Sequence, residues 1–123
     1  MFLFFLILYF SQIVFALPFT RSVAYTVYSA TLSDDVVGCQ TSVSNMTNIV
    51  VNLYAIPSSG NYVICITDEL GFASSNLIDI NAAGTDVINP GNSQLYQIAT
   101  NFKTSCFYSI YDVSVSRWIE RIF

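Results

Sequence analysis

Residues 48–67, NIVVNLYAIPSSGNYVICIT, predict two β-strands joined by a turn. In both halves, β-branched and aromatic side chains recur with a period of two residues, which is typical of a strand with one buried face. Between the halves, Pro-Ser-Ser-Gly at residues 57–60 supplies the fixed and permissive backbone angles of a turn. The expected strands are therefore Asn48–Ile56 and Asn61–Thr67.

The same pattern recurs along the rest of the chain. Four further strands are expected, at Ser22–Leu32, Asn76–Ile80, Leu95–Phe102 and Cys106–Ile119. Clusters of Gly, Pro and Asn separate them, and no stretch has the spacing of an amphipathic helix. Several short strands in a chain of 123 residues and 13.7 kDa predict a single all-β domain, a small β-sandwich.

The composition narrows the classes of function. Only 10% of the residues are charged, the formal net charge is -4, and there are 4 basic residues, too few for a nucleic-acid-binding stripe. The chain has no histidine, which argues against the usual acid–base and nucleophile systems and against most metal sites. We expect no enzyme activity, no metal and no cofactor. The paired carboxylates, Asp34-Asp35 and Asp68-Glu69, are interpreted as solvated turn charges.

The first residues predict a targeting signal. Residues 1–16 are almost wholly apolar, and Val14 and Ala16 occupy the positions that signal peptidase reads, just before Leu17. We expect cleavage after Ala16, a mature domain over residues 17–123 and a secreted or endoplasmic reticulum location, with no stable membrane span after cleavage. The alternatives are an uncleaved membrane anchor and a buried first strand or helix.

The cysteines and one polar triplet agree with this location. In an oxidising lumen, two of Cys39, Cys65 and Cys106 should form a disulfide, and the residues alone leave the pairing open. The alternative is that all the thiols stay reduced and buried. Asn45-Met46-Thr47 matches the acceptor pattern for N-glycosylation, so we expect a glycan on Asn45.

An ordered set of motifs resembles a known family. The set is Asp34-Asp35 before Cys39, Cys65 followed by Asp68-Glu69-x-Gly71, Ile78-Asp79-Ile80, Cys106-Phe107-Tyr108, Asp112-Val113-x-Val115 and an apolar end at Phe123. Together with the leader, it resembles the coronavirus accessory glycoprotein encoded by open reading frame eight. The resemblance covers roughly residues 32–123 and the signal peptide.

The resemblance carries its own expectations. It implies an immunoglobulin-like β-sandwich and a disulfide between Cys39 and Cys106. Cys65 corresponds to a family cysteine whose partner is missing here, because no cysteine lies between positions 66 and 105. Cys65 is then expected either to be a buried free thiol or to form an intermolecular bond. The family's glycan follows the Ile-Asp-Ile segment, whereas the sequon here is at Asn45.

The function implied by the resemblance is that of a non-catalytic viral accessory protein that modulates the host immune response. Its expected partners are host secretory-pathway or immune proteins. Independently, the 8 Tyr residues and the few charges favour protein contacts, including self-association or addition of a partner's strand. The alternative function is a lumen-retained structural module that associates with itself and engages the folding machinery.

Overall fold

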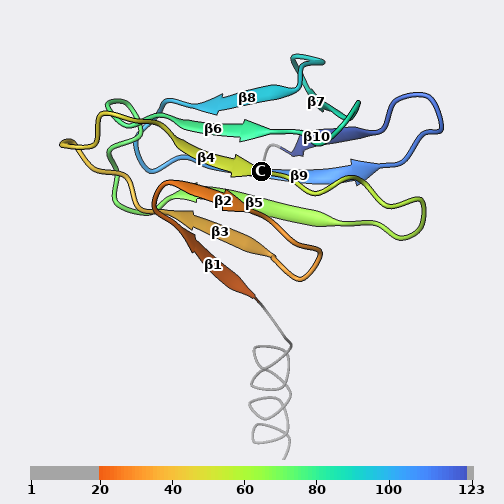
Figure 1. Cartoon of the computed structure of the whole chain (residues 1–123), viewed down its shortest axis with the longest axis horizontal. Coiled ribbons are helices and arrows are strands. Elements are labelled where there is room, and N and C mark those ends of the chain that lie inside the picture. The colour runs from red at the N-terminus through yellow and green to blue at the C-terminus, as the bar shows by residue number, and fades with distance from the viewer. Residues whose placement is uncertain (1–19, 122–123) are drawn as a thin grey trace, which may run out of the picture.

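The computed structural model describes residues 20–121 as an all-β sandwich (Figure 1). Two sheets pack against each other around one apolar core, so the predicted β-sandwich is confirmed. The leader over residues 1–16, its cleavage after Ala16 and the start of the mature domain lie outside the described residues.

Within residues 20–121, ten strands make up the two sheets. In order across the six-stranded sheet, they are β1 (Arg21–Ala24), β3 (Val36–Cys39), β5 (Val63–Asp68), β9 (Thr104–Ile110), β10 (Arg117–Arg121) and β7 (Val87–Asn89). The four-stranded sheet consists of β2 (Val27–Ser29), β4 (Ile49–Asn52), β6 (Ile78–Asn81) and β8 (Leu95–Ile98).

The chain winds between the two sheets. From β1 to β9, each strand lies in the sheet opposite to the strand before it. Where the chain crosses to the other sheet and returns, the two successive strands of the first sheet can run parallel, as β1 and β3 do. The pairs β1–β3, β3–β5, β7–β10, β2–β4 and β4–β6 are parallel, and the remaining 3 pairs are antiparallel. Immunoglobulin sandwiches are built from antiparallel strands. The pairing therefore shows a sandwich of mixed strand direction.

Alternating side chains build the core between the sheets. Ile64 and Phe107 come from the six-stranded sheet and Ile80 from the other, and all three are 0% exposed. Trp118 of β10 is equally buried, and its ring packs edge-on against Tyr54. The two-residue period recognised in the sequence is thus the period of burial.

Two expected strands are broken in the structure. The strand expected at Ser22–Leu32 bends at Tyr25 and Thr26, and its two halves, β1 and β2, join different sheets. The strand expected at Cys106–Ile119 is a hairpin, in which a loop over residues 111–116 separates β9 from β10. In the first case the two halves pair with strands of different sheets, and in the second the two halves pair with each other. The strands β3 and β7 were not expected.

The disulfide joins Cys65 to Cys106, so the expected Cys39–Cys106 bond and the expected unpaired Cys65 are both wrong. Cys65 and Cys106 face each other directly across the β5–β9 pair, on the outer side of the sheet. Cys39 lies opposite Asp68 in the β3–β5 register, which puts its thiol on the inner side, where it is 0% exposed. Because β5 lies between β3 and β9, Cys39 cannot reach Cys106.

Candidate protein-binding surface

Three loops meet at one end of the sandwich, on the left in Figure 1. They follow β3, β5 and β8 and cover residues 40–48, 69–77 and 99–103. They meet because β3 and β5 run parallel and end at the same edge, while β9, which follows the third loop, runs antiparallel to β5. We call this surface the loop end.

One buried carboxylate holds these loops together. Asp68, the last residue of β5, is 2% exposed. Its Oδ1 accepts hydrogen bonds from Thr41 Oγ1 at 2.5 Å and from the Gly71 amide at 2.9 Å. Its Oδ2 accepts bonds from the amides of Ala73 and Phe102, both at 3.0 Å. Each of the three loops therefore donates to the same carboxylate, which fixes their relative positions.

The hydrogen bonds also determine the ionisation of Asp68. Burial by itself raises the pKa, because it disfavours the charged form. The bonds from Thr41 and from the three amides outweigh burial and hold the pKa of Asp68 below its ordinary value of 3.8. The carboxylate is thus ionised at neutral pH.

The interpretation of the paired carboxylates as solvated turn charges is wrong for Asp68 and for Asp34. Asp34 is 3% exposed and accepts hydrogen bonds from Ser22 Oγ at 2.5 Å, Tyr28 Oη at 2.7 Å and the Thr31 amide at 2.8 Å. Asp68 ends β5 on its inward-facing side, with Ile64 and Ile66, whereas Asp34 precedes β3 and is turned inward by its hydrogen bonds. One feature of the sequence does indicate the role of Asp68. Asp68 precedes Gly71 by three positions, a spacing that favours a turn in which the aspartate side chain accepts a hydrogen bond from a backbone amide of the turn.

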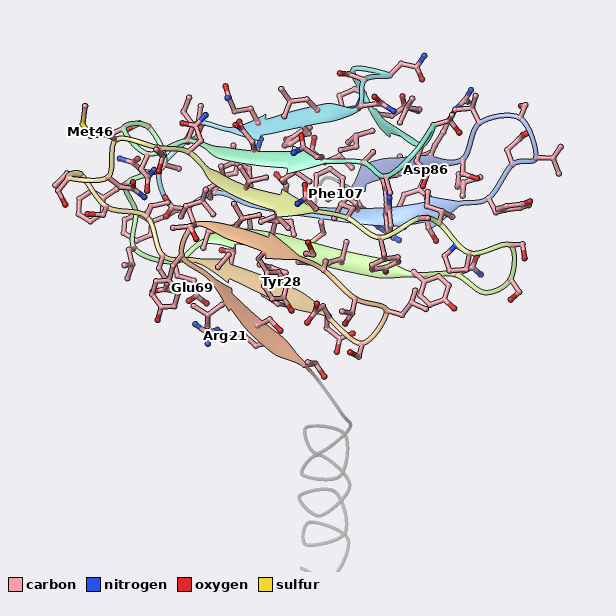
Figure 2. The ribbon with its side chains drawn as sticks, viewed as in Figure 1. Arg21, Tyr28, Met46, Glu69, Asp86 and Phe107 are labelled. Atoms are coloured by element: carbon pink, nitrogen blue, oxygen red, sulfur yellow. A yellow bond between two sulfur atoms is a disulfide. The ribbon has the colours of Figure 1, made fainter. Side chains whose placement is uncertain are left out.

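Glu69, the partly exposed neighbour of Asp68, links the loop end to β1. Glu69 forms an ion pair with Arg21 of β1 and accepts a hydrogen bond from Gln40 Nε2 at 2.5 Å. Arg21 and Glu69 lie side by side in Figure 2. The Arg21 hydrogen bond lowers the pKa of Glu69. The Glu69 carboxylate occupies the space above Gly38, where a Cβ would lie 2.3 Å from it.

A second buried polar residue positions the glycosylation triplet. Asn76 is 1% exposed; its Oδ1 accepts hydrogen bonds from the Ser42 amide at 3.1 Å and from Asn45 Nδ2 at 3.3 Å. Thr47 donates to Asn45 Oδ1 through both its amide and its hydroxyl, at 3.1 Å. Met46, between them, is 94% exposed and lies at the tip of the loop (Figure 2). The triplet is therefore on the surface of the loop end.

Apolar side chains project from these fixed loops. Leu70, Phe72 and Phe102 are exposed and surround Gly71, and the Phe102 ring lies where a Gly71 Cβ would be. Gly71 has φ of 84° and Phe102 has φ of 60°, a left-handed conformation that is uncommon for a phenylalanine. Val43 and Met46 extend the apolar surface onto the first loop. Exposed aromatic and methionine side chains on ordered loops are typical of protein-binding surfaces.

The two outer faces of the sandwich differ in chemistry. The four-stranded sheet carries polar side chains that bond across its strands: Asn81 donates to Asn52 at 3.3 Å, and Asp79 accepts from Gln97 at 2.7 Å. The six-stranded sheet carries the disulfide and exposed Val63 and Ile110. The four-stranded sheet also exposes Val27 and Leu95, so both outer faces carry some apolar side chains.

Within the described residues we looked for a reactive thiol and for a cluster of metal-binding side chains. Burial raises the pKa of the Cys39 thiol to about 12, so it is not ionised at neutral pH. Within residues 20–121, no three acidic or cysteine side chains gather as a metal site would require, and no helix is long and apolar enough to cross a membrane. What the loop end offers is an ordered apolar contact surface.

Acid should weaken the fold through Asp34 and Asp68. Hydrogen bonds outweigh burial at both residues, so their folded-state pKa values lie below 3.8 and the unfolded chain takes up protons first. Their stabilisation is complete well above pH 3.8 and is lost as the pH falls through the lower folded-state values. We expect a urea midpoint that is constant from about pH 7 to about pH 5 and falls below about pH 4. A midpoint that rises on acidification would contradict this assignment.

We compared the chain with protein families and with curated proteins. No protein-family model matches the chain, and no curated protein matches it significantly.

Proposed function

We propose that the protein is a non-catalytic binding module that contacts other proteins through the loop end. One observation carries the proposal: the buried Asp68 carboxylate fixes three loops beneath the exposed side chains of Leu70, Phe72 and Phe102. Loops that are already ordered lose little conformational entropy on binding. Aromatic side chains supply the large contact areas on which binding energy concentrates.

We place this module in the endoplasmic reticulum lumen or outside the cell. The apolar leader over residues 1–16 supports that location, as does the disulfide, which persists in oxidising compartments. The sequon at Asn45 lies on the surface of an exposed loop, where a glycan has room.

For the partners, the proposal relies on the sequence resemblance alone. The open-reading-frame-eight glycoproteins imply a viral accessory role, with host secretory-pathway or immune proteins as partners and immune modulation as the outcome. The immunoglobulin-like classification of the sandwich belongs to the same proposal.

The test compares two ends of one molecule. Tagged protein from human cells would be used to capture proteins from secretory-pathway lysate, in three forms: wild type, the double variant Leu70→Ser/Phe102→Ser, and Val113→Ser. Val113 is 91% exposed on the loop between β9 and β10, at the opposite end, and serves as the matched control. We expect the partners held by wild type and by the control to fall at least about 10-fold with the double variant.

Two results would count against the proposal. If all three forms capture the same partners equally, the loop end is not the binding surface. If none captures a partner and the protein stays in the cell as a large assembly with an endoglycosidase-H-sensitive glycan, the lumen-retained, self-associating module is favoured.

A further inference from the structure

The outer side of the six-stranded sheet is apolar on its internal strands. The register places Val63 opposite Tyr108 and Tyr108 opposite Ile119, and it places Ile110 opposite Arg117 in the next row. All five point outward, because their neighbours along each strand face the core. Val63 is 56% and Ile110 is 43% exposed. We call these five side chains the apolar face. Val63 begins β5 and Ile110 ends β9, so the apolar face lies at the end of these strands away from the loop end.

The fold does not require this pattern. Sandwich strands usually alternate an apolar inner side with a polar outer side. At the centre of the four-stranded sheet, β4 and β6 direct three polar side chains outward, those of Asn52, Asp79 and Asn81. The exposed Val27 and Leu95 lie on the edge strands of that sheet, β2 and β8. Apolar side chains on the internal strands β5, β9 and β10 are instead typical of a surface that makes contacts.

The charges at outward strand positions of this sheet are positive. Three of the 4 basic residues of the chain, Arg21, Arg117 and Arg121, occupy such positions. Within the described strands of the sheet, no outward position carries a carboxylate. The Arg21 charge is offset by its ion pair with Glu69. Arg117 is exposed and interacts with the charge of Asp112, whose carboxylate also accepts hydrogen bonds within its own loop.

We propose that the apolar face binds a partner protein whose contact surface is apolar and bordered by carboxylates. Val63, Tyr108 and Ile110 supply the apolar contact, and aromatic side chains concentrate binding energy at such contacts. Arg117, beside Ile110, supplies a guanidinium group that binds a carboxylate through two parallel hydrogen bonds. This surface is separate from the loop end and gives the protein a second place to bind.

Charge favours this partner over two other occupants. A second copy of the chain, packed symmetrically on the same face, would bring arginines against Arg117, and like charges across an interface cost free energy. An anionic membrane attracts clusters of basic residues, whereas this protein has 4 basic residues and a net charge of -4. An acidic partner protein meets Arg117 with the opposite charge.

The test selects random peptides, displayed on phage, that bind the oxidised, secreted protein. Synthetic copies of the selected peptides are then titrated into the protein and followed by nuclear magnetic resonance. We expect a class of peptides that shifts the signals of Val63, Tyr108 and Ile110 saturably. These peptides should combine large apolar side chains with a net negative charge, and added salt should weaken them.

Two variants assign the contact. Val63→Ser/Ile110→Ser removes apolar side chains from the apolar face and should weaken these peptides at least about 10-fold. Arg117→Gln removes one exposed charge and should weaken them about 3-fold, with a smaller dependence on salt.

Two further variants are matched controls. Val27→Ser/Leu95→Ser removes apolar side chains of similar exposure from the outer side of the four-stranded sheet, and it should leave peptide binding unchanged. Leu70→Ser/Phe102→Ser alters the loop end and should also leave it unchanged. A failure of this proposal is therefore distinguishable from a failure of loop-end binding.

Any of four results overturns the proposal. The first is that no selected peptide shifts the signals of the apolar face, and the second is that the peptides that do so are neutral or basic. The third is a wild-type dimer in analytical ultracentrifugation that Val63→Ser/Ile110→Ser dissociates, which would make a second copy the occupant. The fourth is binding to phosphatidylserine-containing vesicles that the same variant abolishes. The charge of the peptides is read on the wild-type protein, so that result stands even if a variant fails to fold.

Discussion

Replacing Cys65 and Cys106 together by alanine should lower the free energy of unfolding by about 4 kcal/mol. The bond joins residues 41 positions apart, and the loop that it closes restricts the unfolded chain. A small domain is stable by only about 5–15 kcal/mol, so the variant should lose a large fraction of its stability and unfold at a clearly lower urea concentration than wild type. The measurement is urea unfolding of the variant and of wild type under non-reducing conditions.

Cys39→Ala is the matched control for the disulfide variant. Cys39 is a core thiol that behaves as a small apolar side chain, so its truncation should cost about 1 kcal/mol. The account would be wrong if Cys39→Ala destabilised the protein as much as the double variant does, because that result would place Cys39 in the bond.

Asp68→Ala should destabilise the protein by at least about 3 kcal/mol. The substitution removes the acceptor for Thr41 and for three loop amides, and it leaves buried donors without partners. Amide hydrogen exchange should become faster at Gly71, Ala73 and Phe102, since all three donate to Asp68.

The control for Asp68→Ala is Asp79→Ala. Asp79 also accepts side-chain hydrogen bonds, but on a solvent-facing sheet surface, so its loss should cost about 1 kcal/mol or less. Equal destabilisation by the two variants, or unchanged exchange at the amides of Gly71, Ala73 and Phe102, would show that Asp68 does not hold the loop end together.

The sequence predicts strand positions better than strand partners. The two-residue period of residues 48–67 gives β4 and β5, since burial on one face leaves that period in the chain. The assignment of each strand to one of the two sheets leaves no comparable pattern in the sequence. The bend at Tyr25 and Thr26 divides a run whose pattern continues without interruption, and only the packing of the whole domain assigns its halves to two sheets.

The predicted pairing of Cys39 with Cys106 is wrong because it, too, depends on which strands are neighbours. The resemblance assigns Cys106 to Cys39, but a disulfide depends on which side of a sheet each thiol faces and on which strands are neighbours. The β3–β5 register points Cys39 into the core, and the β5–β9 register brings Cys65 opposite Cys106. Neither register can be read from one strand by itself.

The candidate site was predicted in part. The sequence indicated the exposed triplet at Asn45 and a surplus of aromatic side chains for contact. It did not indicate that Asp68 is buried, because a carboxylate in a turn is usually solvated and only its four donors, which come from three separate loops, make burial favourable.

Cys65 and Cys106 form the disulfide of the sandwich, and Cys39 is a free thiol buried in its core. Peptide mapping by mass spectrometry tests this most directly, with free thiols alkylated before and after unfolding and without reductant. We predict one linked peptide pair that contains Cys65 and Cys106, and a Cys39 that is alkylated only after unfolding. A linked pair that contains Cys39, or a Cys65 that is alkylated in the native protein, would contradict the account.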